Sequence, residues 1–457
     1  NNKPATNNPW LNPDARHPFN VGYDFNHESM ATKDLVNRVT KYWLQEFHID
    51  GYRWDLSKGF TQVNNPTNVG AWGAYDASRI KIWKAIYDTM QATSPGSYCM
   101  LEHFADNSEE KELADYGMLL WGNANHSFTE ATMGYTSTSN FGTGFSNARN
   151  FAQQHLVTYM ESHDEERLQY KNLNFGNGSG SYSTKNPATG LKRNEMAAAF
   201  WALTPGPKLM WQFGELGYDF SINTCTNLTV DANNCRLAEK PIKWDYLQDA
   251  NRKALFDAYA KFLKLRATPA YVTDFGSNKY TANTAGAIKS MQLNGDSIKL
   301  VVVGNFDVTP QTATVSFPTD GFWYSLYSNK YQLVSGGSAS VSLQPGEYYV
   351  YSNKNLNNAV ITATPNISLP LLNTTISISP NPVTQAAIVK YQLPESGKVQ
   401  VKLLSQAGVV VDGLFNGWQN KGQQQLMINK KGLPPGVYHI SIQSNQKQKT
   451  QTFLITN

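Results

Sequence analysis

Hydrophobic residues recur at helical spacing in several stretches between residues 31 and 266, and short apolar runs separate these stretches. In residues 31–47, for example, Leu35, Val39 and Trp43 share one face of a helix. Further helices are predicted over residues 76–91, 146–154, 194–203 and 252–266, and strands over residues 49–55, 98–102, 116–121, 156–162 and 208–213. Strands that alternate with helices indicate parallel βαβ units. The pattern predicts an α/β fold of the (β/α)8 TIM-barrel type that is N-terminally incomplete, because about five strands are present where a closed barrel needs eight.

After about residue 270 the pattern changes to short strands of alternating apolar and polar residues, such as 298–305 and 339–343. Residues 353–372 are rich in Asn, Pro, Thr and Ser, which is typical of a linker. A chain of 457 residues is too long for one core, so several domains are expected. We predict the incomplete barrel over 1–268, an all-β sandwich over 269–352, a linker over 353–372 and a second all-β sandwich over 373–457.

Composition excludes two broad classes of protein. The net charge is +4 and the lysines and arginines form no basic block, so no nucleic-acid partner is expected. No apolar run approaches 18 residues, so no membrane span is expected. The chain begins with Asn1 and has no hydrophobic leader, which we interpret as a processed product or a fragment. Low charge and many polar and aromatic residues suit a secreted protein, expected to be monomeric, that handles polar ligands such as sugars.

The three cysteines predict at most one crosslink. Cys225 and Cys235 bracket a polar loop and could form a disulfide in an oxidising compartment, the alternative being two free thiols. Cys99 lies in an apolar stretch and is expected to be a buried, small hydrophobic residue.

Three predicted strands end in acidic residues: Asp55, Glu102 and Asp164. The carboxyl ends of parallel barrel strands meet on one face, so these side chains can converge. Arg53 shares a strand face with Asp55, where its guanidinium would hold the carboxylate ionised. Cleavage of a glycoside with retention needs two carboxyl groups about 5–5.5 Å apart, one ionised to attack and one protonated to release the leaving oxygen. Each motif alone is more often structural, but their order and placement together predict a glycosidase site.

At these residues the chain resembles the α-amylase family, glycoside hydrolase family 13. The second, third and fourth signature segments of that family are similar to Gly51-Tyr52-Arg53-Trp54-Asp55-Leu56-Ser57-Lys58, Leu101-Glu102-His103 and residues 159–164. The resemblance covers about residues 9–352. It implies Asp55 as nucleophile, Glu102 as general acid/base, Asp164 as the carboxylate that fixes substrate hydroxyls, Arg53 as the group that orients Asp55, and His163 as a sugar ligand.

The resemblance also implies roles beside the carboxylates. Lys58 would bind a downstream sugar, and the carbonyl of Gly59 could help to ligate a structural calcium ion, although the family usually has histidine at that position. Phe104 and Trp121, at or just past strand ends, are expected to stack on sugar rings, with core packing as the alternative. Trp54 is expected to point into the core, and Glu161 and Glu165 are expected to be solvated loop charges.

The tail has a pattern of its own. It contains Ile378-Ser379-Pro380-Asn381-Pro382, Leu404-Ser405-Gln406-Ala407-Gly408 and Gly432-Leu433-Pro434-Pro435-Gly436-Val437-Tyr438. These segments resemble the C-terminal sorting domain of cargo for the type IX secretion system. The resemblance implies the secretion machinery as a partner and a secreted or cell-surface location in a Gram-negative bacterium. The alternative is an ordinary accessory or sugar-binding module.

The first signature of the amylase family is not found. Asn26-His27 invites that assignment, but no apolar strand precedes it, and we interpret it as a loop that caps the next helix. Residues 1–28 then resemble the remnant of the family's inserted loop domain. The leading hypothesis is an enzyme that hydrolyses α-1,4-glucosidic bonds of starch-like α-glucans with retention. The alternative is a non-catalytic α-glucan-binding protein of the cell surface, or an inactive fragment of an amylase.

Overall fold

The computed structural model describes residues 3–326, 331–356, 372–405, 410–430, 433–445 and 447–456. The chain forms two compact units, Asn1–Ala359 and Val360–Asn457. Most of the predicted linker and part of the 404–408 tail motif lie outside the described residues. None of the described helices is long and apolar enough to span a membrane.

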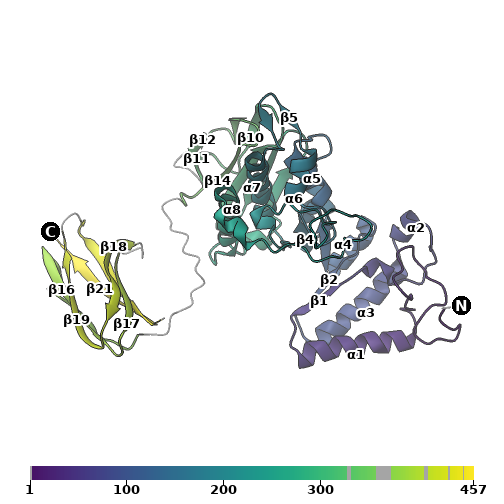
Figure 1. Cartoon of the computed structure of the whole chain (residues 1–457), viewed down its shortest axis with the longest axis horizontal. Helices are drawn as coiled ribbons and strands as arrows, with labels where there is room; N and C mark the ends of the chain where they lie inside the picture. Colours follow the sequence, from purple (N-terminus) through teal and green to yellow (C-terminus); the bar gives the residue numbers. More distant parts are fainter. Residues whose placement is uncertain are drawn as a thin grey trace. The chain divides into compact units, whose positions relative to one another are not determined.

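The first part of the larger unit alternates helices and parallel strands, as the hydrophobic pattern predicts (Figure 1). Its strands form one parallel sheet in the order β1-β2-β3-β4. The helices are α1 (Met30–Glu46), α2 (Val69–Gly73), α3 (Ala77–Thr93), α4 (Asn107–Tyr116), α5 (Asn125–Met133), α6 (Leu168–Phe175), α7 (Pro187–Leu203) and α8 (Ala250–Ala267). The strands are β1 (Gly51–Trp54), β2 (Tyr98–Leu101), β3 (Leu119–Asn123) and β4 (Leu156–Tyr159).

The fifth predicted strand is reduced to a single contact. The segment after α7 runs parallel to β4, where Thr158 donates its N–H to Pro207 O (3.3 Å) and accepts from Leu209 N (3.2 Å). No strand forms over 208–213, because β4 ends at Tyr159 and Phe213 takes a left-handed conformation (φ 61°). Among the described residues, the parallel sheet is therefore open and does not close into a barrel.

Two other predicted elements differ from the structure. The residues predicted as a strand over 116–121 are divided between α4, which ends at Tyr116, and β3, which begins at Leu119; Gly117 between them has φ 130°. The helix predicted over 146–154 is only the 3-10 turn Ser146–Arg149, because Asn150 adopts a left-handed conformation that ends it. The predicted loop before α1 is present, but Asn26 does not cap the helix: its Oδ1 accepts the N–H groups of Glu28 and Ser29, both at 3.1 Å, and the N-cap residue is Ser29.

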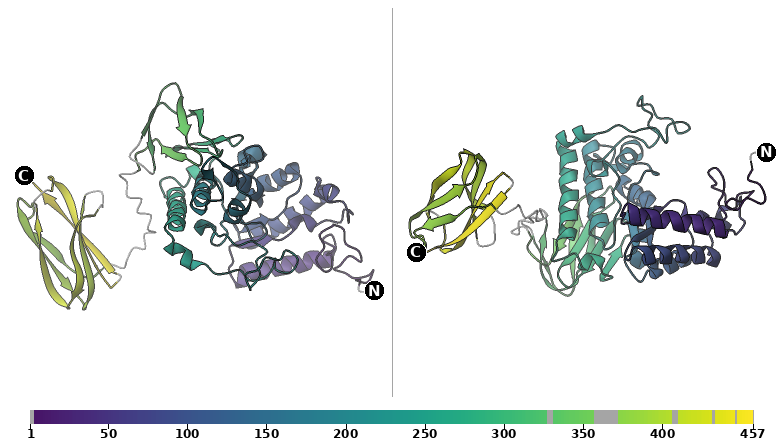
Figure 2. Two further views of the ribbon diagram at one scale, coloured as in Figure 1. Left: turned by 45° about the horizontal axis from the view of Figure 1, so that its top comes forward. Right: turned by 90° about the horizontal axis from the view of Figure 1, so that it is seen from below.

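The β-rich residues that follow α8 share a core with the helices. Two sheets form, in the orders β12-β11-β14-β9-β8-β7 and β10-β13. Trp201 of α7 and Phe262 of α8 are buried in one cluster with Val302 and Val350, so residues 269–352 pack as part of the larger unit rather than separately. Figure 2 shows α7 and α8 side by side in teal. The strands are β5 (Gly178–Ser179), β6 (Tyr182–Ser183), β7 (Tyr280–Asn283), β8 (Ile288–Asn294), β9 (Lys299–Asn305), β10 (Gln311–Ser316), β11 (Gly321–Ser325), β12 (Tyr331–Val334), β13 (Ser338–Leu343) and β14 (Tyr348–Ser352).

The smaller unit is all β, as predicted. Its two antiparallel sheets have the orders β15-β16-β19 and β18-β17-β20-β21. Inward residues of both sheets, such as Val389, Val401 and Ile440, form a single buried cluster, which is the core of a β-sandwich. The strands are β15 (Ile376–Ser379), β16 (Ala386–Leu393), β17 (Gly397–Ser405), β18 (Val410–Gln419), β19 (Gly422–Asn429), β20 (Gly436–Ser444) and β21 (Lys447–Ile455).

A buried ion pair lies beneath the ends of β1 and β2. Arg79 of α3 donates from Nε and Nη2 to the two carboxylate oxygens of Glu109 on α4, at 2.6 and 2.7 Å. Both side chains are almost fully excluded from solvent. His103 Nε2 lies 2.7 Å from Glu109 Oε1. Burial alone would raise the pKa of Glu109, but the hydrogen bonds from His103 and Arg79 hold that pKa below its usual value.

This network gives a first prediction. Glu109→Gln leaves the Arg79 charge buried and uncompensated, so the free energy of unfolding should fall by about 3–5 kcal/mol. Urea denaturation followed by tryptophan fluorescence measures this change. Glu112→Gln is the matched control, because Glu112 lies on the same helix but pairs with Lys84 at a partly exposed site, and its loss should cost about 1 kcal/mol or less. Equal effects of the two variants would contradict the network's role.

Candidate active site

One guanidinium joins the first two predicted catalytic residues. Arg53 on β1 donates from Nη2 to Glu102 Oε2 at 2.6 Å and from Nη1 to Asp55 Oδ1. The parallel register pairs Trp54 with Leu101, so Asp55 and Glu102 each follow directly after neighbouring strands end. Asp55 lies close enough to Glu102 for its negative charge to raise the pKa of Glu102. The expected orienting contact of Arg53 with Asp55 is present, and it extends to Glu102.

The environments of the two carboxyl groups differ. The Asp55 side chain is 76% exposed and that of Glu102 is 13% exposed. Burial raises the pKa of Glu102, and the adjacent negative charge of Asp55 raises it further, against the opposing effects of the Leu56 N–H and of Arg53. A carboxyl group that keeps its proton to higher pH beside an accessible carboxylate is the arrangement that acid-assisted nucleophilic attack needs.

Trp121 lies under the shared arginine. The Arg53 guanidinium carbon is 4.3 Å from the centre of the Trp121 ring, a cation–π contact. Trp121 is only 4% exposed, so its ring face is not available to a sugar, contrary to the prediction. The Trp121 ring also makes edge contacts with Tyr159 and His163, whose ring centres lie 5.2 and 6.1 Å from its own. Trp121 therefore supports Arg53 and links the first two strand ends to the fourth.

The third predicted carboxylate lies after β4. His163 Nε2 is 3.2 Å from Asp164 Oδ2, and Arg236 Nη2 donates to Asp164 Oδ1 at 2.9 Å. Each carboxylate oxygen of Asp164 therefore has a partner: His163 at Oδ2 and Arg236 at Oδ1. Burial raises the pKa of Tyr159, and the negative charges of Glu165, Glu102 and Asp164, which follow the ends of β2 and β4, raise it further.

Glu165 is a site residue that sequence reasoning missed. It was expected to be a solvated loop charge, but Asn123 Nδ2 (2.5 Å), Ser162 Oγ and Tyr159 Oη (3.3 Å) all donate to it. Burial raises its pKa, and the charge of Asp164 adds to that effect. Glu161 is likewise buried, and it accepts the N–H of Leu168 at 2.6 Å. Because their partners lie up to 42 residues away, no local signal could have found these contacts.

The remaining predicted residues are divided between the surface and the interior. Phe104 is 41% exposed and could present its ring to a ligand. Lys58 is buried: its ammonium donates to Phe104 O at 2.8 Å and lies over the Trp72 ring. This position holds the chain rather than reaching a sugar, contrary to the prediction. Trp54 packs against Trp83, as expected. The structure joins Cys225 and Cys235 in a disulfide and buries Cys99, both as predicted.

The Gly59 carbonyl, predicted as a calcium ligand, accepts the Thr61 N–H at 2.8 Å. A Cβ at this position would lie 2.9 Å from His17 Nε2, so a larger side chain would require His17 to move. Among the residues that the structure describes, no three His, Cys, Asp or Glu side chains form a metal-binding group. Calcium stays a prediction of the resemblance.

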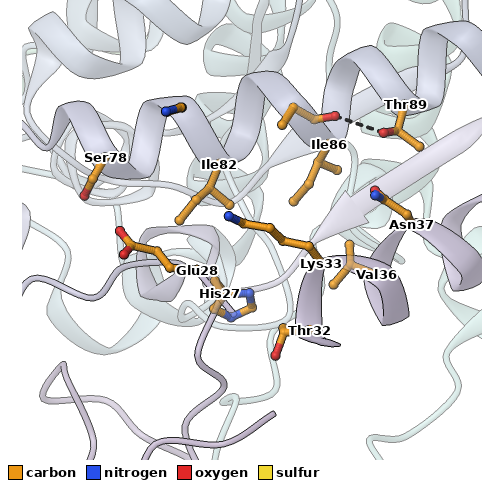
Figure 3. A pocket seen from close by; sticks show the side chains of 12 residues that line it. His27, Glu28, Thr32, Lys33, Val36, Asn37, Ser78, Ile82, Ile86 and Thr89 are labelled. Atoms are coloured by element: carbon orange, nitrogen blue, oxygen red, sulfur yellow. Dashed lines mark hydrogen bonds between the residues drawn. The ribbon is translucent and has the colours of Figure 1, made fainter. Parts of the chain in front are cut away.

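Two pockets lie in this part of the molecule. One, of about 310 Å³, opens beside His163 and is lined by Trp211, Arg236 and Leu237 among others. The other, of about 490 Å³, lies between α1 and α3, and none of the predicted site residues lines it. Figure 3 shows Lys33 of α1 extending toward α3 across Val36, Ile82 and Ile86. The pocket beside His163 therefore adjoins the Asp164 segment, and the pocket between α1 and α3 does not.

Comparison with solved structures identifies the fold. An α-amylase from Anoxybacillus has a TM-score of 0.51 and 15% identity, over 75% of this chain and 70% of that chain. An α-amylase from Geobacillus thermoleovorans in complex with acarbose has a TM-score of 0.53 and 13% identity, over 75% and 71% of the two chains. AmyP in complex with maltose has a TM-score of 0.51 and 15% identity, over 75% and 71%. The larger unit has an α-amylase fold.

The smaller unit is identified by its sequence. Residues 377–456 match the family described as the secretion system C-terminal sorting domain. The chain thus joins an α-amylase fold to a type IX sorting domain, as the two resemblances predict. No curated protein matches the sequence.

The closeness of the two carboxyl groups gives a second prediction. Asp55→Asn removes the negative charge that raises the pKa of Glu102, so this pKa should fall. NMR titration of glutamate carboxyl carbons measures the shift, with Glu102→Gln assigning the resonance. The Glu109 titration serves as an internal control and should not move. An unchanged Glu102 pKa would contradict the proximity of the two groups.

Proposed function

We propose that the protein hydrolyses α-1,4-glucosidic bonds of starch-like α-glucans with retention of configuration. The observation that carries the proposal is the Asp55–Arg53–Glu102 contact. Retaining glycosidases hold their carboxyl groups about 5–5.5 Å apart, whereas inverting ones leave about 6.5–9.5 Å for a water. Two carboxyl groups that accept from the two Nη atoms of one guanidinium fit the close spacing of the retaining arrangement. The α-amylase fold supports the choice of α-glucan.

The proposed reaction has two displacements. Asp55 attacks the anomeric carbon while Glu102 gives its proton to the leaving oxygen, so the glycosidic bond breaks and a glycosyl ester forms on Asp55. Glu102, now ionised, takes a proton from water as that water attacks the same carbon and releases Asp55. The raised pKa of Glu102 suits the first step, and Arg53 stabilises Glu102 once it is ionised.

Three other residues, Asp164, His163 and Phe104, would bind the sugar substrate. Asp164 and His163 would hydrogen-bond the hydroxyl groups of the sugar whose bond is cleaved, and Asp164 would stabilise the oxocarbenium-like transition state. Phe104, with its exposed ring beside Glu102, is the stacking surface that we propose for a neighbouring sugar.

The purified chain should release reducing sugar from soluble starch. Asp55→Asn should abolish release, and Glu102→Gln should lower kcat by about 10²–10⁴-fold, because a missing general acid costs a factor of this size. Arg38→Gln, an exposed substitution on α1, is the control and should leave the rate unchanged. If the chain binds starch but releases no sugar, the non-catalytic glucan-binding function is correct instead.

We propose the smaller unit as the signal that sends the protein through type IX machinery to the cell surface or the medium. Deleting residues 373–457 should keep the protein inside a bacterium that has a type IX system, because this β-sandwich carries the match to the sorting domain. Immunoblots of cell and medium fractions measure the distribution. Starch hydrolysis by the purified truncated chain checks that the larger unit still folds. Secretion of the truncated chain would contradict the proposal.

A further inference from the structure

A disulfide-closed loop lies beside the third carboxylate. Residues 223–240, called here the disulfide loop, are closed by the Cys225–Cys235 bond. Within it, Cys225 N donates to Thr229 O at 2.7 Å. The Lys240 ammonium donates to the carbonyls of Thr224, Cys235 and Ala238, at 2.9, 2.7 and 2.8 Å. The loop is therefore held internally by one covalent bond and by one partly buried set of hydrogen bonds.

The disulfide loop is attached to the segment that carries Asp164 at two points. At its base, Ser221 Oγ and Ile222 N donate to the Glu166 carboxylate at 2.6 and 2.9 Å. At its far side, Arg236 Nη2 donates both to the backbone carbonyl of Asp164, at 2.8 Å, and to its Oδ1, at 2.9 Å. One arginine thus fixes the backbone and the side chain of the same residue.

Arg236 owes its position to the disulfide. It follows Cys235 directly, so the crosslink fixes the backbone from which the arginine extends. The Arg236 and Asp164 side chains are 45% and 43% exposed. A solvent-screened pair between flexible side chains is weak unless other bonds hold its partners in place. The frame around Cys235 supplies that restraint, and it leaves Oδ2 of Asp164 beside His163.

We propose that Arg236 is a positioning residue for the hydrolytic reaction, and that the Cys225–Cys235 disulfide sets its position. Arg236 holds Asp164 in the orientation that meets the sugar hydroxyls in the transition state. The site is thereby coupled to the redox state of its surroundings: reduction by a dithiol breaks the sulfur–sulfur bond, gives two thiols and oxidises the dithiol to a disulfide. The protein is therefore fully active only in an oxidising compartment, such as the one outside the cell. This inference rests on the proposed function.

A mutant cycle on starch or maltooligosaccharide hydrolysis tests the coupling. Arg236→Gln should lower kcat by about ten- to hundred-fold with little change in KM, because a misplaced group costs rate in the transition state more than ground-state binding. Arg236→Lys should restore part of the loss. The Cys225→Ser/Cys235→Ser pair should lower kcat as well, and adding Arg236→Gln to it should give the rate of Arg236→Gln alone. Arg38→Gln remains the control.

An unchanged kcat in Arg236→Gln would overturn the proposal. So would a combined variant whose loss of kcat equals the product of the losses from Arg236→Gln and from the double cysteine substitution. Dithiothreitol should slow the wild-type protein toward the rate of Arg236→Gln and leave Arg236→Gln itself unaffected. Melting temperatures of all variants verify that they fold.

A second readout needs no turnover. Because Arg236 binds the Asp164 carbonyl, amide hydrogen exchange of residues 161–168 should be faster in Arg236→Gln and after reduction of the disulfide, and unchanged in Arg38→Gln. If the wild-type chain releases no sugar, the proposed function fails, while faster exchange still supports the anchoring of Asp164. Unchanged exchange in residues 161–168 would overturn the anchoring itself.

Discussion

The site depends on a single guanidinium held between two carboxyl groups at the ends of adjacent parallel strands. Arg53 can contact Asp55 and Glu102 together because the register of β1 and β2 brings their last residues level with each other. The Trp121 ring packs against the face of the Arg53 guanidinium and so restricts the rotamers of the arginine. At Glu102, burial and the charge of Asp55 raise the pKa against the opposing effects of the Leu56 N–H and of Arg53. One strand pairing therefore places an exposed carboxyl group beside a buried one whose pKa is raised.

A buried polar layer holds this arrangement in place. Ser57 donates to the Glu102 carbonyl and contacts His103, which reaches the Glu109–Arg79 pair. Arg79 also donates to the carbonyls of Lys58 and Trp72. Because every member of the layer is bonded to another, the short turn after β1 has little freedom. Lys58 and His103 thus stabilise the scaffold around the proposed catalytic residues, and their buried side chains are not available to a substrate.

The sequence predicts what depends on local periodicity and on short motifs. Helices α1, α3 and α8 and the strand-end positions of Asp55 and Glu102 follow from apolar spacing, and ten-residue spacing in a polar loop suggests the Cys225–Cys235 bond. Local patterns fail where a contact joins distant segments. The burial of Trp121 under Arg53, the donors to Glu165 and the Arg236–Asp164 contact span tens of residues. The strand predicted over 208–213 fails for a similar reason, since its extent is set by where its neighbour β4 ends.

Capture of the covalent intermediate tests most directly whether Asp55 is the nucleophile of a retaining reaction, as we propose. A fluorinated α-glucosyl fluoride slows hydrolysis of the glycosyl ester more than its formation, so the ester accumulates and peptide mass spectrometry can locate it. The proposed mechanism predicts one added sugar on the peptide that contains Asp55, and none in Asp55→Asn. An adduct on Glu102, on Asp164 or on any other residue would contradict it, as would turnover with inversion of configuration.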